Sequence, residues 1–333
     1  MKKKQCTILL TIILVVSSIA GCSKTESSVS EEYSYHWKLA TTESEDYYMT
    51  QLSQRFLDLV SEKTDGKVTG EVFASGQLGG LVDALEGLEM GNIDVVMDGV
   101  SSLSAVNDMF NAWCLPFLYD SKEHQYLFWD KHFDEVSDLI AEESGYRLVS
   151  IIDGMNRELS STVPVNSLSD LKGLKVRVPN IPGYVRIWEC LGAAPIPMSL
   201  SEVYTSIQTG VVQGQENDIA LTLSLNFYDV APYCVITDHV PYEGSFYFNE
   251  ATYQSYPEEL KQAIKEAAEE IKLESRSMIA ELEQQTMDKI EEKGVTICRP
   301  DLAEFKEATK TMYEEYPSCQ PIIELVEQAR SEL

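Results

Sequence analysis

The chain has 333 residues, of which 54 are acidic and 26 basic, so its formal net charge is −28. Such a balance, without a basic stripe to displace counterions, excludes nucleic acid as a partner. An acidic protein that binds an anion must instead gather its few arginines at one place.

The histidines and cysteines form neither a metal pattern nor a disulfide pattern. The four histidines are scattered, and Cys114, Cys190, Cys234, Cys298 and Cys319 are odd in number and far apart, without CxxC spacing. We therefore expect no metal site, no disulfide framework and no cofactor.

The N-terminus is typical of an export signal. Lys2 to Lys4 form a positive segment, and an apolar stretch from Ile8 to Ile19 follows. This stretch is too short and wrongly flanked for a stable membrane span, so we predict a signal peptide over residues 1–21. Removing it takes away three lysines and leaves 23 basic against 54 acidic residues, a net charge of −31.

The small residues before Cys22 resemble a bacterial lipobox, in which the cysteine sulfur is lipidated and becomes the new N-terminus. Residues 22–34 are then a polar tether. Several acyl chains on one cysteine hold a protein firmly to a bilayer, whereas one chain holds it weakly. We expect an extracytoplasmic lipoprotein anchored to the cell membrane, and an ordinary signal peptide with a chance cysteine is the alternative.

The 312 residues after the signal suit two domains of ordinary size. Short apolar runs alternate with helical patterns, which predicts α/β lobes with largely parallel sheets. In the first part of the chain we predict a strand over His36–Ala40, a helix over Tyr47–Thr64, a strand over Lys67–Phe73, a helix over Leu81–Met90 and a strand over Ile93–Met97.

A helix–glycine–strand unit occurs twice. The first helix stops at Gly91 and leads into a strand. A second helix, which begins at Ser199 with capping-box spacing to Glu202, is closed by Gly210 before a strand starts at Val211. This likeness suits two lobes built on a common plan.

An unbroken helical pattern extends from Pro257 to Lys293. No single lobe of this size needs so long a helix, so we predict that this helix spans both lobes. A free coiled coil is the less favoured alternative, because the apolar stripe is interrupted at Ser275 and Arg276. The predicted buried stripe consists of Leu260, Ile264, Ala267, Ile271, Met278, Leu282 and Ile290.

Arg177 lies at the C-terminal end of a predicted strand, Leu174–Val178, on the face opposite its apolar residues. Asn180 can then cap a helix over Pro182–Leu191. Ligands of open α/β folds bind at this end of the strands. A guanidinium there can hold a carboxylate through two parallel hydrogen bonds, which an ammonium cannot do. A plain surface arginine is the alternative.

Six segments resemble, in order, the hallmarks of one family: VFASGQLGG, MGNIDVVMDG, LPFLYD, DLKGLKVRVPN, SLSEVYTSIQTGVVQGQEN and CVITDH. They are similar to the DctP-like P subunits, the extracytoplasmic solute receptors of TRAP transporters, from about His36 to about Ile323. The resemblance implies an α/β fold with two lobes of the periplasmic-binding-protein type and a long helix spanning both. It implies a small carboxylate as the ligand, and a small and a large membrane subunit as partners.

We expect lobe I to comprise residues 35–154 and 243–282, and lobe II to comprise residues 155–242 and 283–333. In lobe II, Arg177 matches the family's arginine that pairs with the substrate carboxylate. Arg157 matches a second arginine that several members direct into the cleft, and Asn217 matches an asparagine whose amide bonds the same carboxylate. Asn180 is expected to contribute or to serve only as an N-cap.

The first lobe is expected to supply Thr42, near the end of its first strand, and Asp98, after the second unit. An acid such as Asp98 suits a hydroxyl of a sugar acid better than a bare dicarboxylate. The family usually has an aspartate where this chain has Gln213, which puts the local geometry in question. The sialate-binding branch has acidic and basic residues just after QLG and an aromatic residue before SEVY. Here Gly80–Val82 and Leu200 occupy those places, which disfavours sialate.

The sequence contains no Ser/His/Asp, Cys/His, GxSxG or HExxH pattern with supporting context, so we expect no enzymatic activity. A receptor of this architecture that serves an ABC importer or a sensor kinase is the remaining alternative. The ligand stays open between four-carbon dicarboxylates, uronates and other hydroxy or keto acids, because two arginines only weakly favour two anionic ends.

Overall fold

The computed structural model describes residues 33–333, of which residues 34–333 form one unit. The predicted signal peptide, Cys22 and nearly all of the predicted tether lie outside the described residues. Among the described helices, none combines the length and the apolar composition that a membrane span requires.

The first lobe is built on three parallel strands in the order β2-β1-β3, with β10 antiparallel beside β3. Helices α1 and α2 follow β1 and β2 in the chain, close to the positions that the apolar periodicity predicts. The bounds are β1 Tyr35–Ala40, α1 Tyr48–Lys63, β2 Val68–Phe73, α2 Leu81–Glu89, β3 Val95–Gly99 and β10 Pro241–Asn249.

The second lobe repeats this arrangement with parallel strands in the order β8-β6-β7 and an antiparallel strand, β5, beside β8. Strands β5 and β10 pair with each other and join the two halves into one continuous sheet. The bounds are β5 Ile152–Ser161, β6 Lys175–Val178, α4 Pro182–Cys190, β7 Ala194–Pro197, α5 Val203–Gln208, β8 Gly214–Asp218 and α6 Ile219–Ser224.

The two helix–glycine–strand units are present. Gly91 and Gly210 adopt left-handed φ angles of 73° and 74° after α2 and α5, a conformation that favours glycine because it lacks a Cβ. The second strand begins at Gly214, later than predicted. The amides of Val211 and Val212 both donate to Ser206 O, so these residues still belong to the turn that closes α5.

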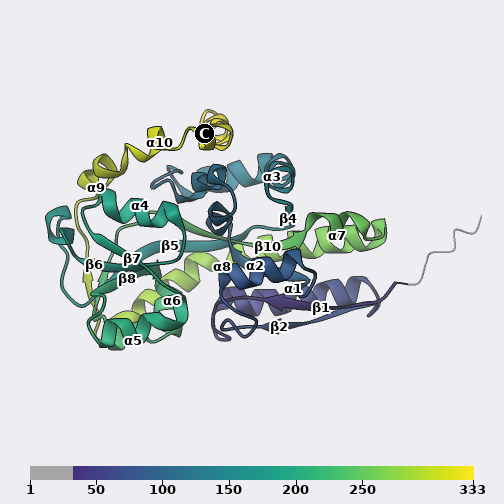
Figure 1. Ribbon diagram of the computed structural model, residues 1–333, viewed down its shortest axis with the longest axis horizontal. Coiled ribbons are helices and arrows are strands. Elements are labelled where there is room, and N and C mark those ends of the chain that lie inside the picture. Colours follow the sequence, from purple (N-terminus) through teal and green to yellow (C-terminus); the bar gives the residue numbers. More distant parts are fainter. Residues whose placement is uncertain (1–32) are drawn as a thin grey trace, which may run out of the picture. The chain divides into compact units, whose positions relative to one another are not determined.

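The long helix α8, Glu258–Glu292, has 35 residues and packs against α1 of the first lobe, α6 of the second and β5 between them. Figure 1 shows it passing behind the sheet from one half to the other. Two residues of the predicted stripe, Met278 and Leu282, are only half-buried. The buried face instead continues through Ser275, Ile279, Thr286 and Ile290, whose spacing keeps the period of a straight helix.

The remaining elements cover the two lobes. Strand β4 pairs with β10, and β9 pairs with both β5 and β11. The C-terminal helix α11 packs against α3, where His124 Nε2 lies 2.9 Å from Val326 O. Figure 1 shows the yellow C-terminal segment ending beside α3. The bounds are α3 Lys122–Ser144, β4 Tyr146–Leu148, β9 Tyr233–Val235, α7 Glu250–Ser255, β11 Thr296–Cys298, α9 Leu302–Thr309, α10 Met312–Glu315 and α11 Gln320–Arg330.

The lobe boundaries remain a prediction, but the packing of α11 differs from the expected placement of all residues 283–333 in lobe II. Helix α3 packs on β4, which pairs with β10 in the first lobe's half of the sheet. Ile322, Val326 and Ala329 belong to the same apolar core as Phe128 and Trp129 of α3. The chain end therefore returns to the first lobe.

Candidate functional site

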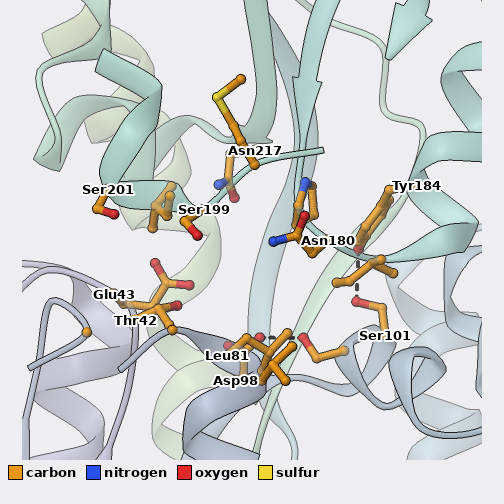
Figure 2. A pocket seen from close by; sticks show the side chains of 18 of the residues that line it. Thr42, Glu43, Leu81, Asp98, Ser101, Asn180, Tyr184, Ser199, Ser201 and Asn217 are labelled. Atoms are coloured by element: carbon orange, nitrogen blue, oxygen red, sulfur yellow. Dashed lines mark hydrogen bonds between the residues drawn. The ribbon is translucent and has the colours of Figure 1, made fainter. Parts of the chain in front are cut away.

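A cavity of about 450 Å³ is lined by residues of both lobes, within the usual range of about 300–1,000 Å³ for small-molecule sites. All six residues predicted to bind the ligand line it: Thr42, Asp98, Arg157, Arg177, Asn180 and Asn217. Figure 2 shows Thr42 and Asp98 on one wall, facing Asn180 and Asn217 on the other. Their role in binding a ligand remains a prediction.

The shared plan of the lobes explains why these side chains meet. Thr42 is the second residue after β1, and Asn180 is the second residue after β6. Asp98 and Asn217 each stand seven residues after the glycine that closes the preceding helix, at the ends of β3 and β8. Carboxyl ends of parallel strands are where α/β folds place their ligands, so each lobe presents equivalent strand ends to the cavity.

Arg177 on β6 is a buried cation without an ion pair. Its side chain is 3% exposed, and no carboxylate of residues 33–333 lies within ion-pair distance of it. Its Nε and Nη2 donate to Met198 O at 3.0 and 2.8 Å, which occupies one edge of the guanidinium. The edge formed by Nη1 and Nη2 remains for a carboxylate. Burial lowers the pKa of Arg177 to about 10, so it is protonated at pH 7.

Arg157 on β5 is buried too, but its charge is neutralised. Its Nε donates to Glu216 Oε2 at 2.6 Å, and its Nη2 donates to Glu216 Oε1 at 2.9 Å. The rings of Tyr184 and Tyr242 lie 4.8 and 5.4 Å from its guanidinium carbon. His239 Nε2 lies 3.3 Å from the same carboxylate. Although burial opposes the charge, Arg157 holds the pKa of Glu216 below its usual value.

Arg157 therefore offers at most its Nη1 group to the cavity, and it does not supply a second unpaired charge. The sequence argument that two arginines favour two anionic ends loses its basis here. Glu216 belongs to the GQEN segment, but nothing in the sequence indicates that its partner is an arginine on another strand.

The two asparagines differ in how they are held. Asn217 Oδ1 accepts a hydrogen bond from the amide of Asp218 at 3.1 Å, which leaves its Nδ2 free to donate into the cavity. Asn180 is not an N-cap, because α4 begins at Pro182 and its cap position is Ile181, without a side-chain bond. The exposed side chain of Asn180 instead lies at the cavity.

The first lobe contributes an acidic wall. Asp98 Oδ1 accepts from Gly99 N at 2.7 Å and from Ser102 Oγ at 2.5 Å, and burial raises the pKa of Asp98. Glu43 was not predicted from the sequence. Its Oε1 accepts from Tyr242 OH at 3.0 Å, while its buried Oε2 has no partner among the described residues. Burial, then Asp98 and Asp218, raise the pKa of Glu43 to about 8.

A signal for Glu43 existed in its position, since it directly follows Thr42 at the end of the first strand. Glutamates are so common in this chain, however, that position alone did not separate it from the solvated ones. The signal that does separate it is burial, which is a tertiary property.

Hydrogen bonds join the two walls beside the cavity. Ser101 Oγ lies 2.9 Å from Tyr184 OH, a contact visible in Figure 2. On another side, the hydroxyl of Tyr47 donates to the carboxylate of Asp218. A third bond, from Ser44 Oγ to Ser224 Oγ at 3.1 Å, also joins the lobes. Such contacts are expected of a receptor whose lobes close around a ligand.

The departures from the family pattern leave the cavity intact. Gln213 lies outside the cavity lining, and its Oε1 accepts from the amide of Lys175 at 3.3 Å. Leu81 and Leu200, at the positions that differ from the sialate-binding branch, present apolar side chains to the cavity. Within residues 33–333 there is no group of three His, Cys, Asp or Glu side chains that could hold a metal ion.

Comparison with known proteins gives a consistent result. The model of the family described as bacterial extracellular solute-binding protein, family 7, matches residues 39–318. A solute-binding protein of Roseobacter denitrificans is 34% identical over 77% of this chain and 79% of its own length. The 2,3-diketo-L-gulonate-binding periplasmic protein of Escherichia coli is 27% identical over 86% of this chain and 87% of its own length.

Solved structures agree. A TRAP periplasmic solute-binding protein of Roseobacter denitrificans with bound L-galactonate superposes with a TM-score of 0.82 at 31% identity, over 88% of this chain and 99% of that one. One from Xanthobacter autotrophicus with bound β-D-galacturonate gives 0.84 at 25% identity, over 89% and 99%. The two-lobed fold with a spanning helix is therefore confirmed. The chain belongs to family 7 of the bacterial extracellular solute-binding proteins, the DctP-like solute receptors of TRAP transporters.

Proposed function

We propose that the protein captures a small carboxylate with Arg177 and Asn217, closes its lobes around it and delivers it to the small and large membrane subunits of a TRAP transporter. The observation that carries this proposal is the buried guanidinium of Arg177, which has no carboxylate partner among residues 33–333. An unpaired buried charge is costly, and a ligand carboxylate relieves that cost.

The hydrogen-bond donors of Arg177 and Asn217 account for part of the free energy that micromolar binding requires. The free edge of Arg177 and the amide of Asn217 can each form a charge-assisted bond, at roughly 1.5–3 kcal/mol apiece. Micromolar affinity requires about 8 kcal/mol. Contacts from the first lobe supply the remainder when the lobes close, and no chemical step on the ligand is needed.

The location of the protein is inferred from its family. Solute receptors of this family are extracellular, and lipidation of Cys22 would keep the receptor beside its transporter. Cys22→Ser is expected to release the protein from membranes into the soluble fraction. Retention of this variant in the membrane fraction would argue against the lipid anchor.

Binding of small organic acids, measured by calorimetry and thermal shift, tests the anchor. Arg177→Ala and Arg177→Lys are both expected to abolish ligand-induced stabilisation, since lysine lacks the guanidinium's parallel donors. Arg186→Lys is a matched control, because Arg186 is partly exposed and paired with Glu315 outside the cavity. Undiminished affinity in Arg177→Lys would show that another group holds the carboxylate.

A further inference from the structure

Two buried acids, Glu43 and Asp98, line the first lobe's side of the cavity. Glu43 is 5% exposed, yet its Oε2 has no hydrogen-bond partner among the described residues. A buried polar atom without a partner is rare in native proteins and calls for an explanation. Figure 2 shows the carboxyl group of Glu43 directed across the cavity toward the wall that carries Ser199 and Asn217. Its natural partner is therefore a group on the ligand.

Asp98 extends the acidic wall of the first lobe. Its Oδ1 accepts two hydrogen bonds from the protein, whereas Oδ2 accepts none from residues 33–333. Both acids line the same cavity as Arg177. The first lobe therefore presents two oxygen acceptors to the end of the ligand that lies away from Arg177.

The charges around the cavity admit one anionic group. Arg157 is neutralised by Glu216, so Arg177 is the unpaired cation among the cavity-lining residues. A second carboxylate at the far end of the ligand would lie against Glu43 and Asp98. No described residue that lines this wall is a cation, so that carboxylate would be buried without a counter-charge, which is costly.

A hydroxyl suits this wall better than a cationic nitrogen does. Recognition of a ligand ammonium commonly uses open aromatic faces, but the two aromatic residues of the cavity, Tyr184 and Tyr242, already lie against the guanidinium of Arg157. A carboxyl group whose pKa is raised to about 8 can also donate as well as accept, as hydroxyl partners require.

We propose that Glu43, together with Asp98, binds hydroxyl groups at the end of the ligand remote from its carboxylate, and that this wall, whose described residues offer no cation, excludes acids with a second carboxylate there. The ligand is then a polyhydroxylated monocarboxylate, an aldonate or a uronate. This inference rests on the proposed function only in that Arg177 holds the carboxylate.

The test uses matched acids that differ at one end. Galactonate and gluconate have a terminal hydroxymethyl group where galactarate and glucarate have a carboxylate, and galacturonate and glucuronate complete the panel. Calorimetry on the full-length protein is expected to show at least one monocarboxylate binding at least 100-fold more tightly than its matched aldarate. Glu43→Lys, which supplies a cation at this wall, is expected to reduce this ratio at least tenfold, and Glu43→Ala to weaken monocarboxylate binding at least tenfold.

Glu45→Lys is the matched control, since Glu45 is exposed and lies outside the cavity lining. It should leave the ratio unchanged. An unchanged melting temperature in Glu43→Lys verifies that this variant is folded. The inference is overturned if Glu43→Lys keeps the wild-type ratio, if Glu43→Ala keeps the wild-type affinity for monocarboxylates, if aldarates bind as tightly as monocarboxylates, or if none of the six acids binds.

Succinate, malate and a zwitterionic amino acid separate the two proposals. Tight binding of one of these that is lost in Arg177→Lys would overturn the role of Glu43 and leave the role of Arg177 standing. Discrimination between sugar acids and aldarates that depends on Glu43 but survives Arg177→Lys would instead overturn the assigned carboxylate anchor.

Discussion

Arg177 and Arg157 line the same cavity and are similarly buried, but within residues 33–333 only Arg157 has a carboxylate partner. We predict that replacing Arg157 by methionine, an unbranched apolar side chain, destabilises the ligand-free protein, whereas the same replacement of Arg177 does not. The comparison tests the electrostatic account of the site without knowledge of the ligand.

The magnitudes follow from the contacts. Lowering the pKa of Arg177 to about 10 corresponds to roughly 3 kcal/mol that the folded state spends on keeping this group charged. Arg177→Met removes that cost but leaves Met198 O without its donors, a loss of about 1–3 kcal/mol. The net result ranges from no change to about 2 kcal/mol of added stability. Arg157→Met leaves the buried carboxylate of Glu216 without its cation and, among the described residues, with only His239 beside it as a hydrogen-bond partner, which costs about 3–5 kcal/mol.

Urea unfolding at pH 7 measures both variants against the wild type. Each protein must first be unfolded, dialysed and refolded, because a co-purified ligand stabilises only the proteins that bind it. The reasoning predicts a large loss in Arg157→Met and none in Arg177→Met. Equal losses in the two variants would refute it, since burial rather than pairing would then set the cost.

Three further results are expected. Burial raises the pKa of Glu243 to about 7, so between about pH 4.5 and 7 this group binds more protons in the folded protein than in the unfolded chain, and its contribution to stability falls as the pH rises. Urea unfolding at several pH values should show a shallower fall of stability in Glu243→Gln than in the wild type, and parallel curves would contradict this prediction. Ser275→Ala removes the acceptor of the buried Asp153 amide and should cost about 1–3 kcal/mol in urea unfolding, whereas an unchanged midpoint would exclude this contribution. Tyr184→Phe keeps the ring beside Arg157 but loses the hydrogen bond to Ser101, so the affinity for the ligand should drop by up to about tenfold while the melting temperature stays unchanged. Full ligand affinity in calorimetry would rule out a role of this hydrogen bond in closing the lobes.

Patterns along the chain were enough to predict much of the fold. Strand alternation placed Arg177 at a strand end facing away from the apolar core, and the structure has it there, at the cavity. The glycines at 91 and 210 marked two equivalent helix ends. The 35-residue helix followed from its periodicity. These features depend on neighbouring residues, and local physical chemistry is what a sequence displays directly.

The electrostatics of the site were decided by contacts between distant residues. Arg157 and Glu216 are 59 positions apart and meet because β5 pairs with β8. Glu43 is distinctive only because burial leaves one of its oxygens without a partner among the residues that the structure describes. The packing of α11 on α3 likewise joins distant segments. A sequence shows which charges exist, whereas the tertiary structure decides which are paired and therefore which remain for a ligand.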